Sequence, residues 1–164
     1  MSAVAPADAR RARSGVAQIV AAWLPVLAWL GVIWCLSSDR FSKDVTAGWW
    51  TASPTVAALD MSPQTIDTAN VILRKTAHFV EYAVLSMLGY RALGATATRR
   101  RRGVQLFGAV LLAMACSAVD EWRQANTLTR TGSPWDAVLD GCGAIAGALL
   151  GGWSLYWRSA RRRA

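Results

Sequence analysis

The chain has 164 residues, of which 54% are hydrophobic and 17% charged, against roughly 45–50% and about 25% in average soluble domains. The length indicates one domain, and the apolar content excludes an intrinsically disordered chain and argues against a cytosolic enzyme. The 18 basic residues outnumber the 10 acidic ones, for a net charge of +8. Because they occur in short runs beside apolar stretches, they indicate membrane flanks rather than a nucleic-acid-binding surface.

Four apolar stretches are long enough to cross a bilayer as helices, namely residues 16–36, 76–93, 103–119 and 137–157. The first would be about 31 Å long. It follows a basic run, as a signal peptide does, but it is too long and lacks an A-x-A cleavage site, so we expect it to remain as a span. The sequence predicts an all-α membrane protein with one domain of four transmembrane helices over residues 16–157.

Charge predicts the orientation of this bundle. With the basic tails 1–15 and 158–164 in the cytoplasm, the inner segments carry twelve basic residues and one acid, and the outer segments six basic residues and nine acids. This asymmetry favours both termini inside. Trp49, Trp50, Trp122 and Trp135 then fall near the outer interface, where tryptophan is enriched.

The connection after the first span, residues 37–75, is expected to be extracytoplasmic. Ser62 followed by Pro63 is a typical helix start, with serine at the cap and proline in the first turn. Because residues 63–93 are too many for one upright span, we expect residues 65–75 to lie partly on the outer membrane surface.

Ionisable side chains gather at the outer ends of the predicted spans. Lys75, His78 and Tyr82 share a helix face, and Glu81 is close enough to contact His78. The third span ends and the fourth begins with further polar residues, which are Asp120, Glu121, Gln124, Arg130, Asp136 and Asp140.

The fourth span carries a stripe of small residues. Asp140, Gly143, Gly147 and Gly151 form one continuous face with GxxxGxxxG spacing. Small residues allow helices to approach closely in lipid, so we expect this face to pack against another helix of the bundle. Asp136 and Asp140 would then point inward, since a carboxylate facing lipid is costly.

Three interpretations of these polar residues remain open. They form a ligand or substrate site, a buried network that only locks the helices together, or a site for a hard cation. No metal and no cofactor is expected, because the lysine and the arginines nearby compete for the carboxylate oxygens. The single histidine also excludes zinc sites that need two or three, and three cysteines without a CxxC motif exclude a zinc ribbon or a disulfide framework. Whether Cys116 and Cys142 pair is left open.

Two blocks of these residues resemble the VanZ-like family of small bacterial membrane proteins. One is K-x-x-H-F-x-E-Y-x-x-L, from Lys75 to Leu85; the other is D-E-x-x-Q from Asp120, followed by Arg130, Asp136, Asp140 and Gly143. Arg123 stands where a histidine is common in the family, and Asp140 where an asparagine is common.

The resemblance implies a multi-pass protein of the bacterial cytoplasmic membrane, in a family linked to glycopeptide (teicoplanin) resistance, a role not assumed for this chain. We expect the polar site to bind or modify a lipid-linked or cell-wall-related molecule at the extracytoplasmic face. Lys75 and Arg130 would hold an anionic group, with Tyr82, Gln124, Asp136 and Asp140 beside it. His78 oriented by Glu81 would transfer a proton, and Asp120 or Glu121 would act as a second acid or base. The alternative is a non-catalytic structural or assembly protein. The expected partners are the bilayer and an envelope precursor, and no nucleic acid.

Overall fold

The computed structural model describes residues 7–97, 101–125 and 134–161, and these are almost entirely helical. In chain order the helices are α1 (Ala7–Leu36), η1 (Asp39–Phe41), α2 (Lys43–Thr51), α3 (Pro54–Ala58), α4 (Pro63–Thr96), α5 (Arg102–Ala125) and α6 (Pro134–Arg161). No strand occurs in these three ranges. The all-α prediction is therefore confirmed.

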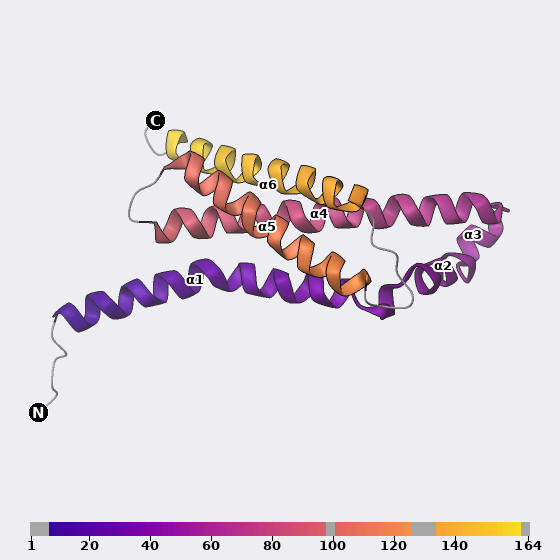
Figure 1. The fold of residues 1–164 in the computed structure, drawn as a ribbon, viewed down its shortest axis with the longest axis horizontal. Helices are drawn as coiled ribbons and strands as arrows, with labels where there is room; N and C mark the ends of the chain where they lie inside the picture. Colours follow the sequence, from indigo (N-terminus) through magenta and orange to yellow (C-terminus); the bar gives the residue numbers. More distant parts are fainter. Residues whose placement is uncertain (1–6, 98–100, 126–133, 162–164) are drawn as a thin grey trace, which may run out of the picture.

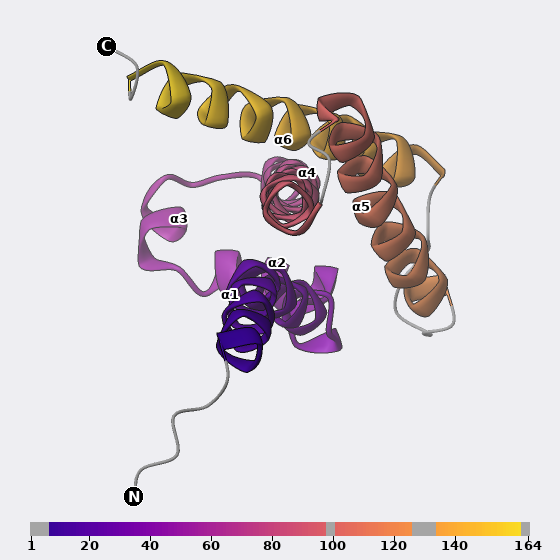
Figure 2. The same cartoon turned by 90° about the vertical axis from the view of Figure 1, so that its left-hand side faces the viewer.

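Helix α4 is the centre of the molecule. It packs against α1, α5 and α6, and α5 also packs against α6. Seen along the bundle, the three other long helices surround α4 (Figure 2). The four long helices alternate in direction, so α1 begins and α6 ends at the same end of the bundle (Figure 1).

The closest helix contact joins α6 to α4 through the glycine stripe. A Cβ on Gly143 would overlap the carbonyl oxygen of Phe79, and one on Gly147 would overlap that of Ala83. Only residues without a side chain permit this approach of two backbones. The stripe therefore fixes the rotation of α6, and with it the direction of Asp140 one turn earlier.

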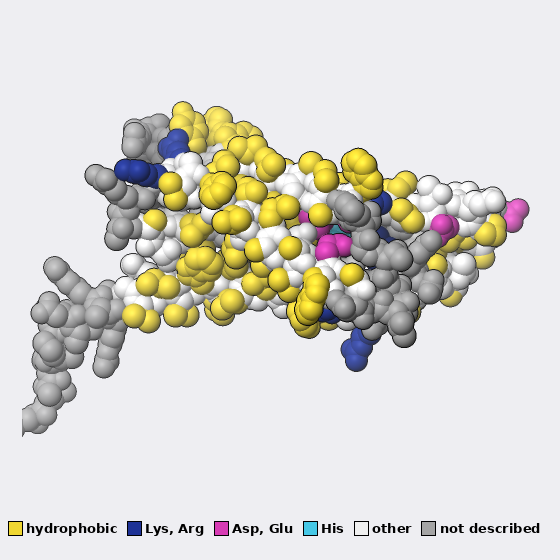
Figure 3. All heavy atoms as spheres, in the orientation of Figure 1, with side chains coloured by type: hydrophobic (Ala, Val, Ile, Leu, Met, Phe, Trp, Pro, Cys, Tyr) yellow, Lys and Arg dark blue, Asp and Glu magenta, His cyan; other side chains and the backbone are white. Residues whose placement is uncertain are grey.

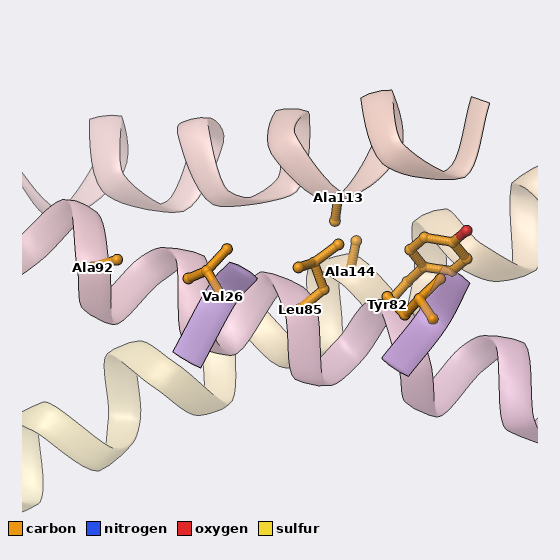
Figure 4. Close-up of a cluster of buried hydrophobic side chains, with 7 residues drawn as sticks. Val26, Tyr82, Leu85, Ala92, Ala113 and Ala144 are labelled. Atoms are coloured by element: carbon orange, nitrogen blue, oxygen red, sulfur yellow. The ribbon is translucent and has the colours of Figure 1, made fainter. Parts of the chain in front are cut away.

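The buried core is small and made largely of small side chains. Tyr82 and Leu85 of α4 lie against Val26 of α1, Ala113 of α5 and Ala144 of α6 (Figure 4). Alanine at these contacts brings the helix axes close together, as in helix pairs that associate in lipid rather than water.

Three helices have the length and apolar composition of membrane spans, over Gly15–Leu36, Arg102–Ala125 and Trp135–Trp157. Many of their large apolar side chains point outward, among them Leu24, Phe107 and Leu149, and hydrophobic side chains cover much of the visible face of the bundle (Figure 3). A soluble protein rarely exposes so wide an apolar surface. This chain is a membrane protein.

Helix α4 is not one of these three apolar spans, and it carries polar residues where neighbouring helices cover them. Glu81 and Ser86 are buried in the bundle, where its neighbours shield them from lipid. The predicted start of this helix is confirmed, since Ser62 caps it by accepting a hydrogen bond from the Thr65 backbone N–H at 3.2 Å.

The connection between α1 and α4 contains more structure than expected. It folds into η1, α2 and α3, and α2 packs against α4. Residues 65–75 continue α4 without a break. The 34 residues of α4 make a rod of about 51 Å, whose first turns extend beyond the ends of the other long helices (Figure 1).

Candidate functional site

A cavity of about 530 Å³ lies where α1 ends and α2 packs on α4. The α4 wall is formed by Arg74, Ala77, His78 and Glu81, spaced i, i+3, i+4 and i+7, which is one helix face. The opposite wall is apolar and aromatic, and it includes Leu36, Phe41, Trp49 and Trp50. The cavity thus combines an apolar body with a few ionisable groups at one side, as ligand sites commonly do.

Arg74 positions one end of this cavity. Its Nη1 donates a hydrogen bond to the backbone oxygen of Phe41 at 2.8 Å, which ties η1 to α4. Arg74 therefore brings a positive charge to the wall of the cavity.

His78, Glu121 and Asp140 meet behind the cavity, each from a different long helix. One ligand-type atom from each of the three lies within 4.8 Å of the others. His78 Nδ1 is 3.7 Å from Asp140 Oδ1, and Asp140 Oδ2 accepts a hydrogen bond from Ser117 Oγ at 2.7 Å. We call these three residues the three-helix cluster.

Asp120 belongs to a separate network that joins α5 to the end of α1. Its Oδ2 accepts hydrogen bonds from Ser37 Oγ at 2.7 Å and from Gln124 Nε2 at 2.6 Å, and its Oδ1 from Arg123 Nη2 at 3.0 Å. Arg123 also donates to the Ser37 backbone oxygen at 2.6 Å and lies over the ring of Trp34. Asp120 is 5% exposed, so this carboxylate is buried with three donors on it.

The remaining predicted site residues lie in different surroundings. Lys75 Nζ pairs with Asp136 Oδ1 at the surface, on a different face of α4 from the cavity. Tyr82 is buried in the core with its ring centroid 6.4 Å from that of His78, and its hydroxyl has no hydrogen-bond partner among the residues that the structure describes. Arg130 is outside the described residues, and so is the predicted pairing of Arg130 with a carboxylate.

Sequence reasoning missed three residues that shape the site: Arg74, Ser37 and Ser117. Arg74 was detectable in principle, because it precedes His78 by four residues and Glu81 by seven. Ser37 and Ser117 give no signal in the sequence, since each becomes relevant only through a carboxylate on another helix.

All three cysteines are free thiols, which answers the question left open for Cys116 and Cys142. Two of them, Cys35 and Cys142, are exposed on the outside of the bundle.

The family model described as VanZ/LLP1 matches residues 22–155. This range includes the second half of α1, all of α4 and α5, most of α6, the cavity and the three-helix cluster. No curated protein and no solved structure matches the chain significantly.

Proposed function

Because this chain belongs to the VanZ/LLP1 family and is a membrane protein, we propose that it binds an amphiphilic, lipid-linked or cell-wall-related molecule in the cavity beside α4. The observation that carries the proposal is the cavity itself. Its apolar walls suit a hydrocarbon chain, and Arg74 suits an anionic group attached to that chain.

The proposal includes a topology of four spans in the bacterial cytoplasmic membrane, formed by one domain over residues 16–157 with both termini in the cytoplasm. Helix α4 counts as a span in this topology because three apolar helices surround it. The basic runs then lie at the cytoplasmic end. The cavity opens at the extracytoplasmic end, within reach of the outer leaflet.

The roles of individual residues follow from their surroundings. Arg74 takes the anion-binding role that the sequence suggested for Lys75, since Arg74 lines the cavity, whereas Lys75 does not and pairs with Asp136. His78 and Glu81 line the cavity and are the groups available for proton transfer to a bound molecule. Asp120 carries three hydrogen bonds and has a positioning role in the proposal.

The proposal is tested by filling the cavity. Ala77→Trp places an indole in the cavity, and Val80→Trp, its matched control, places one on an exposed position of the same helix. Lipids extracted from each purified variant are quantified by mass spectrometry. We expect one anionic amphiphile to co-purify with the wild type and with Val80→Trp, and to be lost from Ala77→Trp. Equal lipid content in both variants would refute the proposal.

A second candidate function is structural, and the Asp120 network favours it. This network ties α1 to α5 through buried bonds that need no ligand. His78→Gln separates the two functions. If the protein is a binding protein, the variant stays abundant in the membrane and binds less amphiphile; if the polar residues serve only to lock the helices, abundance and melting temperature fall together.

A further inference from the structure

The three-helix cluster contains a carboxylate oxygen with unsatisfied capacity. Asp140 is 1% exposed, and its Oδ1 accepts no hydrogen bond from any residue that the structure describes. Ser117 holds the other oxygen, so the carboxylate cannot turn away. Leaving a buried charged oxygen without a partner is costly, and His78 Nδ1, at 3.7 Å, is too far for a hydrogen bond.

Two of the cations expected to compete for this oxygen, Lys75 and Arg123, are engaged elsewhere. The sequence predicts no metal because nearby lysine and arginine side chains, Lys75 and Arg123 among them, compete for the carboxylate oxygens. In the structure Lys75 pairs with Asp136, and Arg123 pairs with Asp120 at 3.0 Å. Neither contributes an ion pair to Asp140 within the described residues, so these two side chains do not balance the charge of Asp140.

We propose that His78, Glu121 and Asp140 bind a divalent transition-metal cation, with Zn²⁺ as the ion that the donor set fits best. One imidazole nitrogen and two carboxylate oxygens are zinc ligands, and three protein ligands with an open fourth position are typical of zinc sites that handle a further ligand. An imidazole ligand makes the site unfavourable for Mg²⁺ and Ca²⁺, because these cations prefer ligand sets made entirely of oxygen atoms.

The geometry requires a modest adjustment on binding. Donor atoms up to 4.8 Å apart must approach to about 3.3 Å for tetrahedral bonds near 2.0 Å. Asp140 is fixed, whereas His78 and Glu121 are partly exposed and can move. The Zn²⁺ would lie at the wall of the cavity, because His78 lines both sites. The inference does not depend on the amphiphile, since an empty cavity leaves the three donors in place.

The test is Zn²⁺ binding by the full-length protein in detergent. The protein is purified with a histidine-free tag, stripped with a chelator and titrated with Zn²⁺ or Mg²⁺ by calorimetry, and its melting temperature is followed in parallel. We expect one equivalent of Zn²⁺ to bind and to raise the melting temperature, and Mg²⁺ to do neither.

Variants locate the site. Asp140→Asn and Glu121→Gln keep side-chain size and should each weaken Zn²⁺ binding by about tenfold or more. Asp136→Asn removes a carboxylate that lies outside the cluster and should bind Zn²⁺ like the wild type. The inference is overturned if the folded wild type takes up no Zn²⁺, or if both cluster variants bind as the wild type does. Zn²⁺ binding measured in the cavity-filled Ala77→Trp variant keeps this outcome distinct from that of the amphiphile.

Discussion

Replacing Gly147 by alanine tests the contact on which the bundle depends. The added Cβ would overlap the carbonyl oxygen of Ala83 and would lie 2.8 Å from its Cα, whereas carbon atoms in contact need about 3.5–4.0 Å. The obstacle is backbone, so no rotamer change relieves it. Helices α4 and α6 must therefore separate locally.

The cost can be bounded from this geometry. Overpacking of this kind costs about 1–3 kcal/mol, and a contact with rigid backbone belongs at the upper end. Alanine gains at most about 1 kcal/mol over glycine in helix propensity, which leaves a net loss of about 2 kcal/mol. For a chain of this size that corresponds to a melting temperature lower by roughly 4–8 °C.

Thermal unfolding of the detergent-purified protein, followed by near-UV circular dichroism, measures the loss. Gly31→Ala is the matched control, because a Cβ at Gly31 meets no atom within 4 Å; it should leave the melting temperature unchanged or raise it slightly. Gly151→Ala, whose Cβ would come no closer than 3.3 Å to its neighbours, should fall between the two. Equal melting temperatures for Gly147→Ala and Gly31→Ala would refute the close α4–α6 contact.

Other regions of the protein give further testable outcomes. Reporter fusions at Ser53 and Ala164 should report opposite sides of the membrane, and the same side for both would exclude four spans. Lys75→Asp or Asp136→Lys alone should lower the free energy of unfolding by about 1 kcal/mol or less, since the side chains are 48% and 30% exposed. The double variant should recover most of that loss in thermal unfolding. A further loss of stability in the double variant would mean that the two residues do not form a simple ion pair. Asp120→Ala leaves buried hydrogen-bond donors without an acceptor and should lower the free energy of unfolding by about 3–5 kcal/mol. A loss of stability as small as that of the Asp136 variant would contradict a buried network.

The helical class and the apolar spans were predictable because they depend on local sequence. The runs before Leu36 and after Trp135 are long and apolar, and Ser62 with Pro63 marks a helix start without any tertiary information. Helix α4 was harder to predict as a span, since its polar residues are buried only because three other helices cover them.

The helices α2 and α3 were not predicted. They are short, and the serines that precede them, Ser42 and Ser53, make no side-chain capping bond. Helix α2 instead packs on α4, and such packing cannot be read from a local pattern.

The site shows where sequence periodicity reaches its limit. Spacing correctly indicates which residues share a face of one helix, but not which way that face points. Lys75 was expected beside His78 in the site, whereas the cavity lies about 100° around the helix, on the side of Arg74. The pairs that cross between helices, such as Ser117 with Asp140, depend on how each helix is rotated about its axis. The glycine stripe fixes this rotation for α6, and it cannot be read from the sequence.

The central place of α4 has a consequence for biosynthesis. The two helices that cover much of it, α5 and α6, come later in the chain, so the ribosome delivers α4 before its cover exists. Glu81 and Ser86 then face lipid, translocon or water until the C-terminal half arrives. A nascent chain that stops after α4 has no stable place for these groups. Messages shortened within α5 or α6 should therefore yield products that are removed from the membrane, even though α1, the most apolar span, is complete.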